Sequence, residues 1–305
     1  MSPPTPAEPR APATVSIGLP IYNGARTMRR TLDALLGQTF TDFSVLLSDN
    51  ASTDDTEAIG REYAERDPRV RYVRQPVNLG AIGNFLYVFE HSRGPYYSWL
   101  ACDDFYDTPT HLDRLRERLD AGDALAFPNV NHFDLLPDGS VSPRRRDAFG
   151  HFRAADSRVA MTRLAIRGTS HQLYGMFRRE VVARYLPYLA ADATWACFNE
   201  ARFLHWVFSR ERCSFVNEES LNVCHHTGAV SRNVRPLLLL RDYLRLNSLI
   251  PAIYADADYS PADKLRLLGD LGRANAPYLG YLAARSVPAA AVEAWSWITS
   301  RPSRR

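Results

Sequence analysis

Short apolar runs alternate with amphipathic stretches through the first 120 residues. The runs have the apolar and aromatic composition of buried strands, and the stretches between them repeat apolar residues at helical spacing. This strand–helix order predicts a mostly parallel sheet covered by helices on both faces. The expected strands are residues 15–19, 43–47, 70–73 and 96–101. The expected helices are residues 26–36, 54–66, 82–91 and 112–119.

The pattern changes after the fourth expected helix. Residues 124–231 are less regular, and Leu136–Asp147 is expected to be a turn followed by a mobile basic loop. From Pro236 the spacing of apolar residues is helical, with expected breaks at Tyr259–Pro261 and Ala276–Pro277.

These patterns predict three parts of the chain. Residues 1–13, rich in Pro and Ala, are expected to be a disordered lead without the apolar core of a signal peptide. Residues 14–235 are expected to form an α/β domain with a regular first half (14–107) and a less regular second half (108–235). Residues 236–305 form a helical C-terminal region.

Composition excludes several classes of protein. Of 305 residues, 46% are hydrophobic and 23% charged, as in ordinary globular proteins, and the net charge of +3 argues against nucleic acid as the main partner. Four widely spaced cysteines without a CxxC pair predict neither a disulfide framework nor a zinc site, and they fit the reduced cytoplasm. The most apolar stretch, residues 236–255, contains three central charges, so no membrane span is expected.

Polar, turn-forming clusters follow three of the expected strands. They are Pro20–Gly24, Ser48–Asp54 and Cys102–Asp104. In an open parallel sheet, ligands bind beyond the carboxyl ends of the strands, where such loops converge. We therefore expect the functional site at this edge.

Two adjacent carboxylates, Asp103 and Asp104 (the acidic pair), follow the fourth expected strand. They would repel each other in a partly dry cleft unless a cation or hydrogen-bond donors stabilised them. Carboxylate oxygens with few other ligands suit Mg²⁺ or Mn²⁺, which complete their shells with water and phosphate oxygens. Alternatively, the pair caps the helix after Pro109 or faces solvent.

Asp49 and Tyr22 end strands at the same edge. A carboxylate at Asp49 could accept the imide N–H of a uracil or thymine ring, and Tyr22 could stack on the base. In the alternative reading, Asp49 and Asn50 form an Asx-turn leading into the next helix, and Tyr22 is a core aromatic.

The segment VSIGLPIYNGARTMRRTLDALLGQTFTDFSVLLSDNASTDDT and the later Asp-Asp resemble the opening half of family 2 glycosyltransferases with the GT-A fold, over residues 15–107. This resemblance implies a Rossmann-like GT-A sheet and inverting sugar transfer from a UDP-type donor, with dTDP as the alternative base. It also implies a divalent metal, Mn²⁺ or Mg²⁺, on the diphosphate. On this resemblance, residues 14–107 would be the nucleotide-binding half of the domain and residues 108–235 the acceptor half.

The resemblance assigns roles to individual residues. Pro20, Tyr22 and Asn23 would contact the nucleoside, and Asp49 would read the base. Asp103 would contact the ribose or the metal, and Asp104 the metal. The family's acidic motif often reads Asp-x-Asp-Asp, whereas this chain has Ala101-Cys102-Asp103-Asp104, so the first acid is missing.

The family pattern also places a catalytic carboxylate about 90 to 100 residues after the acidic pair, at the start of a helix. Glu200 fits this position, and Asp192, one short loop earlier, is the rival. Such a base typically contributes ~10²–10⁴-fold. Alternatively, Glu200 pairs with Arg202 or Arg210 on a solvated face.

Three further residues match the family less specifically. His226, five residues before Ser231, would approach the diphosphate or the metal, and Arg232 would clamp the diphosphate; either could be structural instead. Asn84, in a loop resembling the family's NxG segment, could hydrogen-bond donor or acceptor, or cap a helix.

The sequence therefore predicts an inverting glycosyltransferase that uses a nucleoside-diphosphate-sugar, a divalent metal and a carboxylate base. A catalytically weak nucleotide-sugar-binding protein and a sugar-phosphate nucleotidyltransferase are the alternatives. The acceptor would be a small molecule or a lipid-linked glycan, reached in the cytoplasm or at the inner face of the membrane. Residues 289–305, with Trp295 and Trp297 before three arginines, could contact that surface peripherally or form a homodimer contact.

Overall fold

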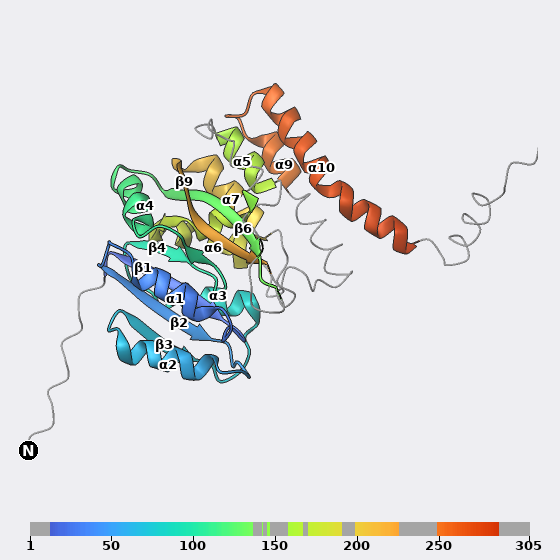
Figure 1. Cartoon of the computed structure of the whole chain (residues 1–305). Helices are drawn as coiled ribbons and strands as arrows, with labels where there is room; N and C mark the ends of the chain where they lie inside the picture. Colours follow the sequence, from blue (N-terminus) through green and yellow to red (C-terminus); the bar gives the residue numbers. More distant parts are fainter. Residues whose placement is uncertain are drawn as a thin grey trace, which may run out of the picture.

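The computed structural model describes residues 13–136, 142, 145–146, 158–166, 170–190, 199–225 and 249–286. Within them the strands form a single nine-stranded sheet (Figure 1). The strands are β1 (Val15–Ile21), β2 (Phe43–Asp49), β3 (Val70–Arg74), β4 (Tyr96–Trp99), β5 (Phe105–Tyr106), β6 (Leu125–Asp134), β7 (Arg145–Arg146), β8 (Met176–Arg178) and β9 (Cys213–His225).

Helices connect and cover these strands. They are α1 (Met28–Leu36), α2 (Thr56–Arg66), α3 (Gly80–Glu90), α4 (His111–Asp120), α5 (Arg158–Ile166), η1, a 3₁₀ helix (Ser170–Tyr174), α6 (Arg179–Ala190), α7 (Asn199–Arg210), α9 (Leu249–Ala255) and α10 (Pro261–Ser286). The four expected strands and four expected helices of the first 120 residues are confirmed, with ends that differ by a few residues.

The sheet order is β3-β2-β1-β4-β8-β6-β9-β5, with β7 beside β6. β1 to β4 run parallel, whereas β8 is antiparallel to both of its neighbours, β4 and β6. β9 runs parallel to β6 again. The predicted fold class, a mostly parallel GT-A type sheet flanked by helices with helices at the C-terminal end, is confirmed.

The core lies on both faces of the sheet because successive strand residues point to opposite sides. On one face Ile17 and Leu47 pack with α1, α2 and α4. On the other, Trp99 and Phe177 pack with α3, α6 and α7. Burial on both faces explains why the central strands read as continuous apolar runs.

The described C-terminal helices pack on the acceptor half through α5. Ile166 of α5 lies in one apolar cluster with residues of α9 and α10. Beside this cluster, the fully buried carboxylate of Asp270 pairs with Arg163 of α5 and with Arg273. The C-terminal region is therefore attached by apolar packing as well as by charge.

Two local predictions need correction. α10 continues through Pro277, so the expected break there is wrong; the loss of one helical N–H can be absorbed by a helix whose other turns remain bonded. Arg145–Arg146, expected in a loop, form β7 and pair with Asn131 and His132.

Several expectations fall outside the described residues. They include most of the lead, nearly all of the basic loop, and the boundary at residue 235. None of the helices in the described ranges combines the length and hydrophobicity needed to cross a bilayer.

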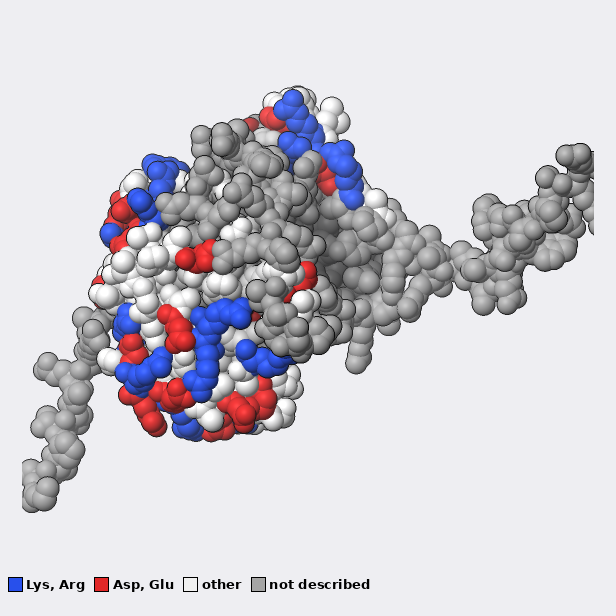
Figure 2. All heavy atoms as spheres, viewed as in Figure 1, with Lys and Arg blue, Asp and Glu red and all other residues white. Residues whose placement is uncertain are grey.

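Surface charge in the nucleotide-binding half is mixed. On the face shown in Figure 2, arginines and acidic residues are interspersed instead of being gathered by sign. Arg29–Glu62, Arg61–Glu57 and Arg66–Asp33 are ion pairs within the nucleotide-binding half. Among the described residues visible in Figure 2, there is no extended basic stripe of the kind that binds nucleic acid.

Candidate active site

The carboxyl ends of β1, β2 and β4 lie at one edge of the sheet. Ile21 at the end of β1 is in register with Asp49 at the end of β2, and Gly18 is in register with Trp99 at the end of β4. The loops that follow are joined by hydrogen bonds. The Asn23 amide donates to Ser52 Oγ (2.9 Å), and Thr31 Oγ1 donates to the Cys102 carbonyl (3.0 Å).

Tyr22 and Asn23 lie at the surface of this edge, and the Tyr22 side chain is 50% exposed. Asn23 has a φ of 53°, a left-handed conformation that asparagine tolerates, and its side-chain oxygen accepts the Thr53 amide (2.8 Å). Pro20 is buried within β1. Tyr22 therefore presents a ring that a base can stack on.

Asp49 holds the loop that follows β2. Its side chain is fully buried, and Oδ1 accepts the Ser52 amide (2.8 Å). Oδ2 accepts the Tyr72 hydroxyl (2.6 Å) and Arg74 Nη1 (2.7 Å) from β3. Both oxygens are thus engaged in this conformation, as in the Asx-turn alternative, and the contact of Asp49 with a base stays a prediction.

Asn84 is also buried. Its Nδ2 donates to the Ser48 carbonyl (2.8 Å) and, at 3.4 Å, to the Ile21 carbonyl, and its Oδ1 accepts Ser48 Oγ (2.5 Å). From within α3 it thus joins the ends of β1 and β2. Because Asn84 lies inside α3, the helix-cap alternative is wrong, and its contact with donor or acceptor stays a prediction.

The acidic pair lies directly beyond β4. Asp104 is 3% exposed, and its Oδ1 accepts the Cys224 amide (2.9 Å). Burial, followed by the charge of Asp103, raises the pKa of Asp104 well above its ordinary value. The β5–β9 pairing brings Cys224 here, and burial together with both carboxylates raises the pKa of its thiol to about 12.

These surroundings fit a divalent cation. Two adjacent carboxylates in a low-dielectric position are destabilised by each other, and a cation would offset that cost. The described residues contain no group of three or more His, Cys, Asp or Glu side chains that could hold a metal by themselves. A cation held by the acidic pair would therefore depend on water or phosphate oxygens, as Mg²⁺ and Mn²⁺ do.

The acceptor half brings Glu200 to the same edge. Glu200 lies in the first turn of α7, which packs on η1. Tyr174, the last residue of η1, has its pKa raised by burial and then by the charges of Asp104, Glu200 and Asp103. The charges of the acidic pair and of Glu200 therefore both act on the phenol of Tyr174. The rival base Asp192, as well as His226 and Arg232, lies outside the described residues.

A group of three histidines was not predicted from sequence. His132 Nδ1 lies 2.8 Å from His225 Nε2, and the rings of His132 and His171 are 4.9 Å apart. Burial and the neighbouring imidazoles lower the pKa of His171 to about 3. These residues come from β6, β9 and η1, and no local signal joins them.

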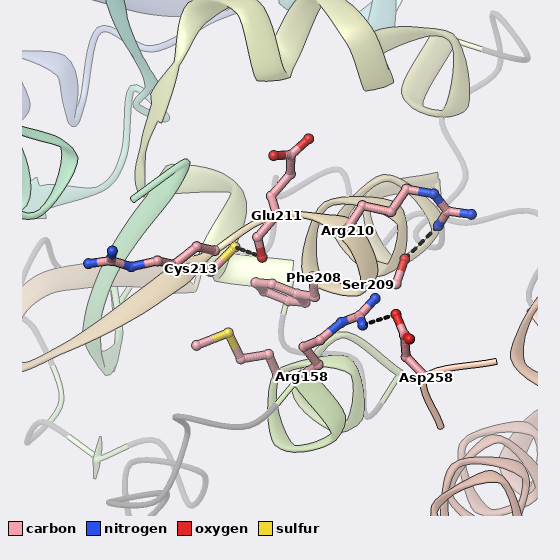
Figure 3. Close-up of a pocket in the computed structure, with 9 residues that line it drawn as sticks. Arg158, Phe208, Ser209, Arg210, Glu211, Cys213 and Asp258 are labelled. Atoms are coloured by element: carbon pink, nitrogen blue, oxygen red, sulfur yellow. Dashed lines mark hydrogen bonds and ion pairs between the residues drawn. The ribbon is translucent and has the colours of Figure 1, made fainter. Parts of the chain in front are cut away.

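A cavity of about 540 Å³ lies elsewhere in the described residues (Figure 3). Cys213 in its lining is in register with Leu125, at the amino end of β6, so the cavity lies at the opposite edge of the sheet. Arg158 of α5 and Asp258, between α9 and α10, form an ion pair across it. It contains no predicted site residue, and its ion pair ties the C-terminal region to α5.

Known proteins resemble this chain in sequence. The model of glycosyl transferase family 2 matches residues 16–186, more than half of the chain. An uncharacterized glycosyltransferase of Rickettsia typhi is 31% identical over 143 residues, 44% of either chain. A chondroitin synthase of Escherichia coli is 37% identical over 94 residues, 30% of this chain and 13% of that one. The chain thus spans less than half the length of these relatives.

Solved structures share the fold at low identity. S. aureus TarS 1–349 in complex with UDP-GlcNAc superposes with a TM-score of 0.66 at 15% identity, covering 86% of this chain and 72% of that one. Mannosyltransferase PcManGT from Pyrobaculum calidifontis, in complex with GDP-Man and Mn²⁺, gives 0.55 at 18% identity, covering 95% and 81%. With the matching family model, these findings show that the chain belongs to glycosyl transferase family 2 and has the GT-A fold.

Proposed function

We propose that this chain transfers a sugar, with inversion, from a nucleoside-diphosphate-sugar to an acceptor hydroxyl, and that the donor is of the UDP type. The observation that carries the proposal is the acidic pair at the carboxyl edge of the sheet, of which Asp104 is buried, together with the exposed Tyr22 ring on the neighbouring loop. Glu200 lies in the first turn of α7, which packs on η1. The relatives that bind UDP-GlcNAc or GDP-Man support a nucleotide-sugar donor.

Each part of the site has a proposed role. Tyr22 stacks on the base, and Asn23 contacts the nucleoside on a loop that Asp49 and Asn84 hold in shape. Asp103 and Asp104 would hold a divalent cation, with the Mn²⁺ of PcManGT as support. When bound, such a cation would stabilise charge on the leaving diphosphate as a Lewis acid.

Ala101 stands where the family often has a further acid. Its methyl side chain has no oxygen that could serve as a ligand to a hard cation. This substitution favours the second candidate, a nucleotide-sugar-binding protein with weak turnover.

Calorimetry and a hydrolysis panel test the proposal. We expect UDP to bind in the presence of Mn²⁺ more tightly than in EDTA, and one UDP-sugar to be hydrolysed slowly. Equal residual hydrolysis by the wild type and Asp104→Ala would favour the nucleotide-sugar-binding protein. Release of pyrophosphate from a nucleoside triphosphate would favour a nucleotidyltransferase. Absence of binding by every nucleoside diphosphate would refute the proposal.

The proposed base is Glu200, with Asp192 as its rival. Replacing the true base by its amide should lower hydrolysis by about 10²–10⁴-fold, because water then loses its proton acceptor, while the Kd of UDP stays unchanged. Glu200→Gln and Asp192→Asn are compared in the hydrolysis assay. Glu211→Gln is the matched control, since Glu211 pairs with Arg184 just beyond the other end of α7. Near-wild-type rates in both test variants would rule out both carboxylates.

A further inference from the structure

Tyr174 is held rigidly at the junction of the sheet and α7. The next residue, Gly175, accepts Ser98 Oγ on its carbonyl (2.9 Å), and its amide donates to the Gln172 carbonyl (3.1 Å). A Cβ at Gly175 would lie 2.5 Å from the Ala126 carbonyl oxygen, so the chain passes against β6 where only glycine fits. The end of η1 is therefore fastened to β4 and β6.

The Tyr174 side chain joins the two halves of the site. Its ring packs against the apolar clusters on both faces of the sheet. Among the described residues its hydroxyl has no hydrogen-bond partner. A phenol is protonated at neutral pH, so this hydroxyl can act as a hydrogen-bond donor.

If the proposed function holds, Tyr174 lies between the two groups that act on the transferred sugar. In an inverting transfer, the sugar lies between the leaving diphosphate and the base, which act on opposite faces of the anomeric carbon. The acidic pair would mark the diphosphate side and Glu200 the base side. Met176 is in register with Ser98 of β4, so Tyr174, two residues earlier, lies beside the chain that leads from β4 to the acidic pair. η1 also packs on α7, whose first turn contains Glu200.

We propose that Tyr174 is a sugar-positioning residue, whose hydroxyl donates a hydrogen bond to a hydroxyl of the donor's sugar between the acidic pair and Glu200. This inference rests on the proposed function. It goes further by assigning recognition of the transferred sugar to a residue of the acceptor half. A site built to hydrogen-bond a substrate hydroxyl discriminates against ligands that lack it.

Tyr174→Phe tests the inference, because it removes one oxygen and keeps the ring that packs in the core. The probes are UDP with Mn²⁺, and whichever of UDP-glucose, UDP-galactose and UDP-N-acetylglucosamine binds the wild type most tightly. We expect the Kd of UDP to stay within about twofold and that of the UDP-sugar to rise about 5–15-fold, as for the loss of one buried hydrogen bond. Tyr185→Phe is the matched control, since the Tyr185 hydroxyl donates to Glu211 beyond the far end of α7 (2.9 Å).

Three results would overturn the inference. An equal loss of affinity for UDP and the UDP-sugar would assign Tyr174 to the nucleotide pocket or to folding. Unchanged affinity with slower hydrolysis would mean that Tyr174 orients Glu200, and no change in either would mean that it only packs. If wild-type protein binds no UDP, the proposed function itself fails first, and that result is distinct from the other three.

Discussion

Asp104→Asn is expected to lower nucleotide-sugar hydrolysis by about 10²–10³-fold, because the change removes a carboxylate from the proposed cation site and several kcal/mol of stabilisation with it. The same change is expected to make the metal-free protein more stable. Asp104 is buried beside Asp103, and its pKa is raised in the folded state. Asparagine keeps an oxygen to accept the Cys224 amide and carries no charge.

The pH dependence follows from the direction of that shift. A carboxyl whose pKa is raised on folding favours the folded state while it is protonated, at acid pH. This contribution is lost as the pH rises from the ordinary carboxyl pKa through the raised value. The stability advantage of Asp104→Asn over the wild type should therefore grow between acid and neutral pH.

Thermal unfolding at several pH values, in EDTA and with Mn²⁺ plus UDP, measures both effects. The wild type should gain stability from Mn²⁺ plus UDP by mass action, and Asp104→Asn should gain much less. Asp107→Asn removes one negative charge at a neighbouring exposed position and serves as the control. An Asp104→Asn variant that is both inactive and less stable than the wild type would show a structural role instead.

Gly18→Ala is expected to lower the free energy of unfolding by about 3 kcal/mol, because it overfills the closely packed centre of the sheet. A Cβ on Gly18 would lie 2.1 Å from the Tyr97 hydroxyl oxygen and 2.7 Å from Val88 Cγ2. Both neighbours are fully buried, so neither can move aside without disturbing β4 or α3.

Chemical denaturation of three variants checks this prediction. Gly272→Ala is the matched control: nothing lies within 4 Å of a Cβ there, and alanine in a helix should stabilise by about 0.5–1 kcal/mol. Adding Tyr97→Phe to Gly18→Ala removes the closest clashing atom and should restore part of the stability. A loss below about 1 kcal/mol for Gly18→Ala would show that the sheet adjusts more easily than its packing density suggests.

The nucleotide-binding half could be predicted from sequence because its strands are buried on both faces and its helices are short and amphipathic. The acceptor half could not. β8 has only three residues, Met176–Arg178, too few to show any periodicity. β9 contains the polar run Asn217–Ser220, and its pairing with β6 shifts register near Asn129, which disrupts the alternation expected of a strand.

At the site, sequence reasoning named Tyr22, the acidic pair and Glu200, which the structure brings to one edge. It did not foresee the hydrogen bonds by which Asp49 and Asn84 hold the loops, and their contacts with a ligand stay predictions. A polar residue at a strand end, such as Asp49, looks the same whether it faces a ligand or a neighbouring loop. Asp49 accepts hydrogen bonds from Tyr72 and Arg74, which are 23 and 25 residues away in the chain. The sequence around Asp49 therefore does not reveal these partners. Tyr174 was missed for a similar reason, since its neighbours at the site come from other elements.

The buried Asp270 constrains how the enzyme can move. Lifting α10 away from α5 would separate Asp270 from Arg163 and expose the apolar seam that includes Ile166. α5, α9 and the first turns of α10 therefore travel as one rigid block. Any opening of the site to admit an acceptor must hinge elsewhere than at this seam.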